Sequence, residues 1–206
     1  MSSELGGKLR QRGLTEPAGE FETAPSRGDG VGERRAEMAG LPKARISLAL
    51  WNLRSIHNVA SILRTADGFA VDTVYFIGTT PHPTLKRDSR LSHVRTKMDR
   101  VFAKTSLGAE KSLNLLRYDC LEEALATIDK PTQIIALEQS PDSHVLPDLP
   151  KLKDDVLLII GEERHGLPPE ILKLCDSSIE IKMQGIKESL NVSVATGIAL
   201  YSISQS

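Results

Sequence analysis

The chain has 206 residues, of which 40% are hydrophobic, 26% charged and 4% aromatic, and its formal net charge is −1. This length suits one domain with a well-buried core, and the charge excludes a globally basic nucleic-acid binder but not a local basic patch. The two cysteines, Cys120 and Cys175, match no disulfide framework or metal site, so we expect a reducing compartment and no bound metal. The longest aliphatic run has five residues (156–160), and the first residues lack a secretory signal, so we expect a cytoplasmic protein without a transmembrane helix.

Residues 1–40 differ in composition from the rest of the chain. They hold eight of the fifteen glycines, with six basic and seven acidic side chains, and their apolar residues follow no helical or strand period. Such a segment buries too little surface to offset its conformational entropy. We expect 1–40 to be a disordered or loosely ordered polar tail, with an RNA-contacting basic arm as the alternative, and 41–206 to be one folded domain.

From residue 41 onward, short aliphatic runs alternate with amphipathic stretches. The aliphatic runs predict strands over 46–51, 73–78, 115–119, 132–138, 156–161 and 178–183. The amphipathic stretches predict helices over 57–69, 121–128, 168–174 and 190–203. This alternation indicates an α/β fold, with a mostly parallel sheet and flanking helices. Ligands of such sheets bind beyond the carboxyl ends of the strands, which directs attention to the loops after Trp51, Gly78, Gly161 and Met183.

The first segment that suggests function runs from Asn52 to Gly78. Asn58 and Arg64 lie on its predicted helix, away from the apolar face. That face is expected to hold Ala60, Leu63, Ala66 and Ala70. Taken alone, Arg64 is an ordinary exposed helix arginine.

The second segment, GEERHGLPP, follows the most aliphatic predicted strand. Gly161 and Gly166 bracket its loop, and glycines at a strand exit allow the backbone to approach a ligand closely. The alternative is a tight strand-to-helix connection. A P-loop is excluded, since Leu167 and Pro168 stand where it needs Lys and Ser or Thr, and no G-x-G-x-x-G follows any predicted strand.

The third segment runs from the strand that we expect to end at Met183 into the last helix. Gly185 lies in the intervening loop, and Ser189 occupies the position expected of an N-cap. On its own, Ser189 is most simply such a cap.

Together the three segments resemble, in order and spacing, the motifs of the SpoU/TrmH family of RNA 2′-O-ribose methyltransferases in the SPOUT superfamily. The first motif is matched by Asn58 and the I-x-R-T-A core from Ile62, and the second by G-x-E-x-x-G-L from Gly161. The third is matched by IKMQGIKESLNVSVA from Ile181. The resemblance covers about residues 46–203, and Glu162 and Lys182 depart from the usual Asn and Pro.

The resemblance implies a deep C-terminal trefoil knot, S-adenosylmethionine as cofactor, a homodimer, and tRNA or rRNA as substrate. We favour tRNA, because the chain lacks the additional RNA-binding domain of many rRNA-modifying members. The implied cofactor-binding residues are Gly161, Glu162, Gly166, Ile181, Met183, Gly185 and Leu190. The implied catalytic residues are Asn58, Arg64, Glu163, Ser189 and Asn191.

We expect Arg64 to hold the target phosphate and stabilise the developing alkoxide, because a guanidinium stays protonated and is a poor base. Asn58 and Glu163 are expected to orient Arg64, and Ser189 and Asn191 to shape the ribose site. The general base is not assigned.

Residues 86–104 form a basic segment with seven basic and two acidic side chains, while the rest of 41–206 carries a charge of −5. We expect an RNA-binding surface that contacts phosphates, with an ordinary solvated helix or loop as the alternative. Its expected members are Arg54, Arg64, Lys86, Arg87, Arg90, Arg95, Lys97 and Arg100.

Two other functions are compatible with the sequence: a non-catalytic RNA-binding relative with the same fold, which Glu162 and Lys182 favour, and a small-molecule-binding α/β protein. The last predicted helix, 190–203, is almost uncharged and apolar on two sides. We expect it to pack across a two-fold axis together with the first-motif helix, and the alternative is complete burial within one subunit.

Overall fold

The structure is a computed structural model that describes residues 44–86, 88–128, 132–146, 152 and 154–205. The predicted tail over 1–40 and Arg87 lie outside these residues. One sheet of seven strands, in the order β3-β2-β1-β6-β4-β7-β5, forms the centre, and its six neighbouring pairs are all parallel. The strands are β1 Ile46–Trp51, β2 Thr73–Ile77, β3 Asn114–Tyr118, β4 Thr132–Leu137, β5 His144–Val145, β6 Asp155–Ile160 and β7 Ser177–Glu180.

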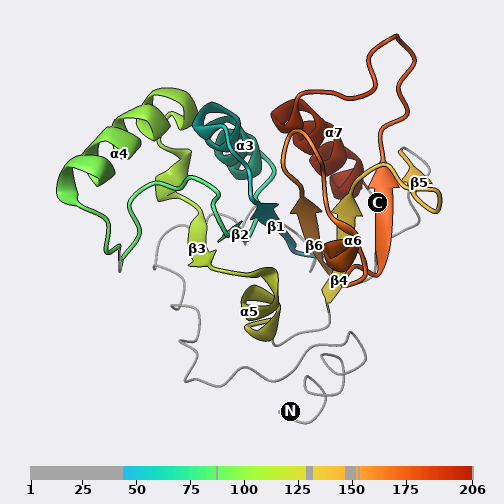
Figure 1. The fold of residues 1–206 in the computed structure, drawn as a ribbon, viewed down its shortest axis with the longest axis horizontal. Helices are drawn as coiled ribbons and strands as arrows, with labels where there is room; N and C mark the ends of the chain where they lie inside the picture. Colours follow the sequence, from blue (N-terminus) through green and yellow to red (C-terminus); the bar gives the residue numbers. More distant parts are fainter. Residues whose placement is uncertain (1–43, 87, 129–131, 147–151, 153, 206) are drawn as a thin grey trace.

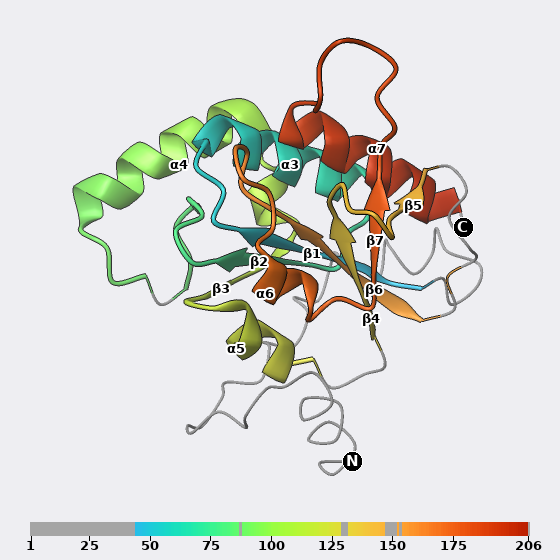
Figure 2. The same cartoon turned by 45° about the vertical axis from the view of Figure 1, so that its right-hand side comes forward.

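Helices cover both faces of the sheet (Figure 1; Figure 2). One face carries α3 Ile56–Gly68, α4 Ser92–Ser106 and α7 Val192–Gln205, and the other carries α5 Leu121–Ala126 and α6 Pro169–Leu172. A short 3₁₀ helix, Ala109–Lys111, follows α4. The predicted α/β class and mostly parallel sheet are confirmed.

The central strand β6 shows why the sheet is buried on both sides. Leu158 and Ile160 contribute to the core beneath α3, α4 and α7, whereas Leu157 and Ile159 contribute to the core beneath α5 and α6. All four are at most 1% exposed. Neighbouring side chains of a strand point to opposite faces, so an uninterrupted aliphatic run is what a doubly covered strand requires.

Several predicted boundaries are wrong, and one helix was not predicted. The strand over 178–183 ends at Glu180, and the last helix begins at Val192. Ala70, expected on the apolar face of the first helix, lies beyond the end of α3 and is exposed at a φ of 54°. The basic segment contains α4, which buries only Phe102 and Ser106 and therefore shows little apolar periodicity.

No described helix is long and apolar enough to cross a membrane. Among the described residues, no group of three or more His, Cys, Asp or Glu side chains could hold a metal ion.

Candidate functional site

The three motif segments meet at the carboxyl edge of the sheet. β1 pairs with β6, so the chain that leaves β1 towards α3 lies beside the loop that leaves β6. α7, which carries the third motif, packs next to α3 on the same face (Figure 2). Residues more than 100 positions apart are thereby brought together.

Glu163 joins the second motif to the first. Its Oε2 accepts a hydrogen bond from the backbone N–H of Arg54 (3.1 Å), and its Oε1 accepts from the N–H of Ser55 (3.2 Å) and from Asn58 Nδ2 (3.0 Å). Ser55 is the N-cap of α3, so the carboxylate lies at the N-terminus of that helix, where a negative charge is favourable. Partial burial favours the neutral acid, but the hydrogen bonds from Asn58, Arg54 and Ser55 outweigh it and lower the pKa of Glu163.

Asn191 joins the third motif to the first. Its Nδ2 donates to Asn58 Oδ1 (3.1 Å), and its Oδ1 accepts from the backbone N–H of Ser193 (2.9 Å). Its carbonyl accepts the first helical hydrogen bond, from Ala195 (2.9 Å). Asn191 is therefore the N-cap of α7, and the prediction that Ser189 occupies this position is wrong. We call Glu163, Asn58 and Asn191 the polar relay, because hydrogen bonds link them in that order.

Arg64 does not belong to the polar relay. It is exposed on α3, and its side chain makes no hydrogen bond or ion pair with any described residue, so Asn58 and Glu163 do not orient it here. The neighbouring Thr65 faces α7: a Cβ placed on Gly197 would lie 3.6 Å from Thr65 Cγ2. The small residue Gly197 thus serves the crossing of α3 and α7 within one chain.

The two motif glycines also stand where other parts of the protein come close to the backbone. A Cβ on Gly161 would lie 2.6 Å from the carbonyl carbon of Gly166, and a Cβ on Gly166 would lie 2.0 Å from Glu138 Oε2. Gly166 also has a φ of +65°, a conformation that favours glycine. These glycines allow protein groups to approach one another closely, and their expected role beside a ligand stays a prediction.

Two residues after β4 were missed at the sequence level. Glu138 Oε2 accepts from the backbone N–H of Leu167 (2.7 Å), and Gln139 Nε2 donates to the carbonyl of Glu188 (2.9 Å). They hold the loops of the second and third motifs, respectively. The available signal was their position directly after a buried strand, where α/β proteins place functional groups.

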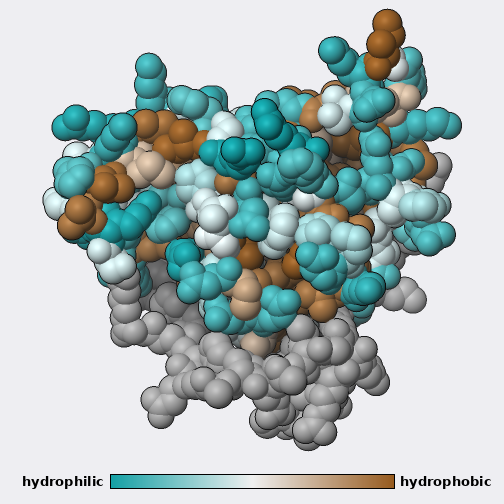
Figure 3. All heavy atoms as spheres, viewed as in Figure 1, coloured by the Kyte–Doolittle hydropathy of each residue, from teal (hydrophilic) through white to brown (hydrophobic). Residues whose placement is uncertain are grey.

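The loop between β7 and α7 contains the remaining predicted cofactor residues, and it projects beyond the sheet and from the surface of the molecule (Figure 1; Figure 3). Ile181 and Met183 are half-buried, and Leu190 is 37% exposed. A Cβ placed on Gly185 would have no other atom within 4 Å. Ser189 is exposed. Within the described residues the hydrogen bond from Gln139 is the only one to residues 182–190, so their other backbone groups are free to bind a ligand.

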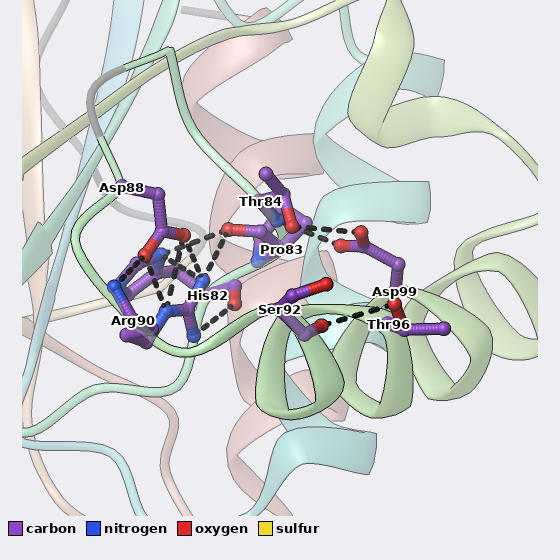
Figure 4. Close-up of polar contacts among 8 residues, drawn as sticks. All are labelled: His82, Pro83, Thr84, Asp88, Arg90, Ser92, Thr96 and Asp99. Atoms are coloured by element: carbon purple, nitrogen blue, oxygen red, sulfur yellow. Dashed lines mark hydrogen bonds and ion pairs between the residues drawn. The ribbon is translucent and has the colours of Figure 1, made fainter.

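The basic segment places its basic residues in two ways, and Figure 4 shows the first of them, around Arg90. Arg90 turns inward: it donates to both Asp88 carboxylate oxygens and to the carbonyls of His82 (3.1 Å) and Pro83 (3.0 Å). Hydrogen bonds from Arg90 hold the pKa of Asp88 well below its usual range, and burial lowers the pKa of His82. These contacts occupy its guanidinium and give Arg90 a structural role, and its predicted contact with RNA stays a prediction.

Most of the other basic side chains that the structure describes here lie at the surface. Lys86, Lys97 and Arg100 are exposed, Arg95 is half-buried, and Arg54 is exposed beside the polar relay. Asp99 of α4 accepts two hydrogen bonds from Thr84, each 2.7 Å, which fix the preceding loop against the helix (Figure 4).

The structure is a parallel α/β domain in which three motif segments converge at the carboxyl ends of the strands. The model of the SpoU rRNA Methylase family matches residues 45–201, and the chain belongs to this family.

Two relatives are tRNA (guanosine(18)-2′-O)-methyltransferases. The one from Aquifex aeolicus is 30% identical over 73% of this chain and 64% of its own length, and the one from Escherichia coli is 27% identical over 82% and 66%. A 23S rRNA (guanosine-2′-O-)-methyltransferase from Haemophilus ducreyi is 29% identical over 71% of this chain and 54% of its own length. The chain thus spans at most about two thirds of these relatives.

Solved structures agree with the fold. The A. aeolicus TrmH/SpoU tRNA modifying enzyme has a TM-score of 0.61 at 26% identity, covering 85% of this chain and 83% of that one. The SpoU methyltransferase AviRb from Streptomyces viridochromogenes, solved with AdoMet, has a TM-score of 0.66 at 21% identity, covering 92% and 62%.

Proposed function

We propose that the protein is an S-adenosylmethionine-dependent methyltransferase that modifies a ribose 2′-hydroxyl of RNA. The observation that carries this proposal is the polar relay, which joins all three motifs at the carboxyl edge of the sheet. The named activities of the relatives support the same reaction class.

The cofactor would lie against the loop between β7 and α7. Free backbone groups over 182–190 suit main-chain recognition of an adenine, and Gln139 and Glu138 fix the two loops around it. When bound, S-adenosylmethionine supplies an electrophilic methyl group. The residues proposed to contact it are Gly161, Gly166, Ile181, Met183, Gly185 and Leu190.

Arg64 is the proposed catalytic cation. Its guanidinium is exposed and uncommitted among the described residues, so it is available to bind a phosphate and to stabilise charge that develops on the 2′-oxygen. Ser189 lies in the loop before α7 and Asn191 is the N-cap of that helix, and both would shape the ribose site. Asn58 and Glu163 keep the N-terminus of α3 in place and so act as positioning residues.

The central test is Arg64→Ala, with Lys173→Ala, at the C-cap of α6, as the matched control for loss of an exposed positive charge. We expect Arg64→Ala to abolish methyl transfer from labelled cofactor while cofactor affinity, measured by calorimetry, stays near that of the wild type. Equal turnover in this variant would remove Arg64 from the mechanism.

We propose tRNA as the substrate, following the two tRNA-modifying relatives. Incubating the protein with labelled cofactor and total RNA from a deletion strain, then mapping the labelled ribose, identifies the RNA and the nucleotide. Label confined to rRNA would contradict this choice. Action in the cytoplasm is part of the proposal, and cell fractionation tests it.

The RNA-binding surface is proposed to be formed by exposed basic residues of α4 and its neighbours, without Arg90. Lys97→Gln together with Arg100→Gln should weaken RNA binding and reduce its salt dependence, because each lost phosphate contact lowers the slope by about one. An unchanged affinity and slope would show that RNA binds elsewhere.

We further propose that the protein forms a homodimer through α7. We also propose that its C-terminal part is tied in a trefoil knot. Val194, Ile198 and Tyr201 of α7 are 50%, 37% and 60% exposed, an apolar face that a second subunit would cover. Sedimentation at micromolar concentration tests the dimer, and an active monomer would refute it. A crystal structure that traces the loops of the second and third motifs tests the knot.

The alternative of a non-catalytic relative has little support from Glu162. This departure from the family pattern bonds His165 and lies outside the polar relay, which is intact.

A further inference from the structure

A small cavity lies at the carboxyl edge of the sheet. It has a volume of about 220 Å³ and is lined by Trp51, Asn52, Glu162, His165, Gly166 and Pro168. Pockets for drug-sized ligands have volumes of roughly 300–1,000 Å³, so this cavity is too small for the whole cofactor and suits a single flat ring.

The cavity is next to the polar relay but distinct from it. Glu162 lines the cavity, whereas the following residue, Glu163, turns to the N-terminus of α3. Trp51 packs with the core beneath α5 and α6, on the face of the sheet opposite α3 and α7. A nucleotide in the cavity would therefore neighbour the site of methyl transfer without occupying it.

The apolar wall is suited to stacking. Trp51 is half-buried at the end of β1, so its ring is held in place and still reaches the cavity, and Pro168 adds a second apolar surface. Unstacked RNA bases bind aromatic side chains in this way, and they are read by hydrogen bonds to their Watson–Crick edges.

The polar wall offers one acceptor and one donor. Glu162 Oε1 bonds the backbone N–H and Nδ1 of His165, while its Oε2 has no partner among the described residues. Asn52 Oδ1 accepts from Thr79 N (2.9 Å) and Oγ1 (3.1 Å), which fixes the amide, and Asn52 Nδ2 makes no hydrogen bond in the described part of the chain. The Glu162 side chain is only 14% exposed, so an unshared carboxylate oxygen there favours a ligand that donates.

We propose that this cavity binds a guanine or uracil base of the RNA substrate, stacked on Trp51. Both bases present a ring N–H beside a carbonyl oxygen, so Glu162 accepts from the N–H and Asn52 donates to the carbonyl. Adenine and cytosine carry an acceptor nitrogen in place of that N–H, so the lone pair of this nitrogen would be repelled by the Glu162 carboxylate. This inference rests on the proposed function, since it takes the ligand to be RNA.

The sequence contains a single tryptophan, so the fluorescence of Trp51 reports on the cavity directly. The probes are five-nucleotide RNAs of adenine that differ only in the central base. We expect quenching with central guanine or uracil at concentrations where central adenine or cytosine gives none. Quenching by all four alike, or by none, would overturn the proposal.

Two variants test the walls, with binding measured from the anisotropy of labelled RNA. Trp51→Leu should weaken binding of the preferred RNA about tenfold through loss of stacking. Glu162→Gln should remove the preference for guanine and uracil, whereas Glu170→Gln, an exposed carboxyl on α6, should keep it. If Trp51→Leu does not fold, Glu162→Gln alone tests the proposal. A preference for guanine and uracil that survives in Glu162→Gln refutes the assignment of the cavity to these bases.

Methyl transfer is measured on the same preparations, so the two proposals fail separately. Base-selective quenching without methyl transfer to any RNA would refute the proposed activity and leave the cavity assignment intact. Transfer without base-selective quenching would refute the cavity assignment alone.

Discussion

Replacing Glu163 by Gln tests whether the polar relay stabilises the fold. In the wild type the carboxylate accepts three hydrogen bonds at the N-terminus of α3. The glutamine amide keeps one acceptor oxygen, but its NH₂ group faces one of the donors that the carboxylate had bound. The substitution also removes the negative charge, which is favourable at this end of the helix. Because Glu163 is exposed, solvent reduces these contributions, and we expect the free energy of unfolding to fall by about 1–2 kcal/mol.

The assay is thermal unfolding followed by circular dichroism, with Glu170→Gln as the control. A loss of this size corresponds to a fall in Tm of roughly 2–8 °C for a chain of this length. Glu170→Gln removes an exposed carboxylate without hydrogen-bond partners among the described residues, so its Tm should change little.

The pH dependence gives a second, independent check on the same variant. The pKa of Glu163 is lowered in the folded state, so its contribution to stability is complete above the unfolded value of about 4.3 and is lost as pH falls through the folded value. The difference in stability between the wild type and Glu163→Gln should therefore shrink below about pH 4. An equal difference at pH 7 and pH 3, or no difference at pH 7, would refute the reasoning.

Two further substitutions have expected outcomes with internal controls. Gly166→Ala should weaken cofactor binding in calorimetry, because the new Cβ would collide with Glu138 and the positive φ costs about 1–2 kcal/mol. Gly68→Ala should leave binding unchanged, because no atom lies within 4 Å of its new Cβ. Asp88→Asn should lower the free energy of unfolding by about 2–3 kcal/mol in urea titrations, since the Asp88 side chain is 2% exposed and paired with an arginine. Asp119→Asn breaks a pair whose carboxylate is 77% exposed and should cost at most about 0.5 kcal/mol; similar losses in both variants would contradict the argument from burial.

The sheet could be predicted from the sequence because its strands are short, aliphatic and bounded by polar residues. β1 has the predicted bounds 46–51, and β2, β3, β4 and β6 differ from the predicted bounds by at most one residue at either end. The strand predicted over 178–183 ends at Glu180 instead. The helix α4 could not be predicted, since most of its side chains face solvent and leave no periodic signal.

The motifs identified three segments that converge in the structure, but not every contact that holds them there. Arg90 illustrates the limit, because a count of charges cannot show that its guanidinium is held by Asp88 and two carbonyls. Glu138 illustrates another, because its contact with Leu167 depends on β4 lying beside β6, a neighbour relation that spacing along the chain does not contain. Local sequence patterns predict individual helices and strands, whereas the roles of Arg90 and Glu138 depend on contacts that form only in the folded chain.

The strand order also affects how this chain folds while it is being synthesised. β1 lies between β2 and β6, and the ion pair of Arg45 with Asp155 joins residues 110 positions apart. A nascent chain can pair β1 with β2 early, but the other edge of β1, with the apolar Leu48 and Leu50, stays unpaired until residues 155–160 leave the ribosome. An open apolar strand edge promotes association between chains. Chaperones that shield such edges should therefore raise the yield of this protein more than that of a domain whose strands pair in the order in which they are made.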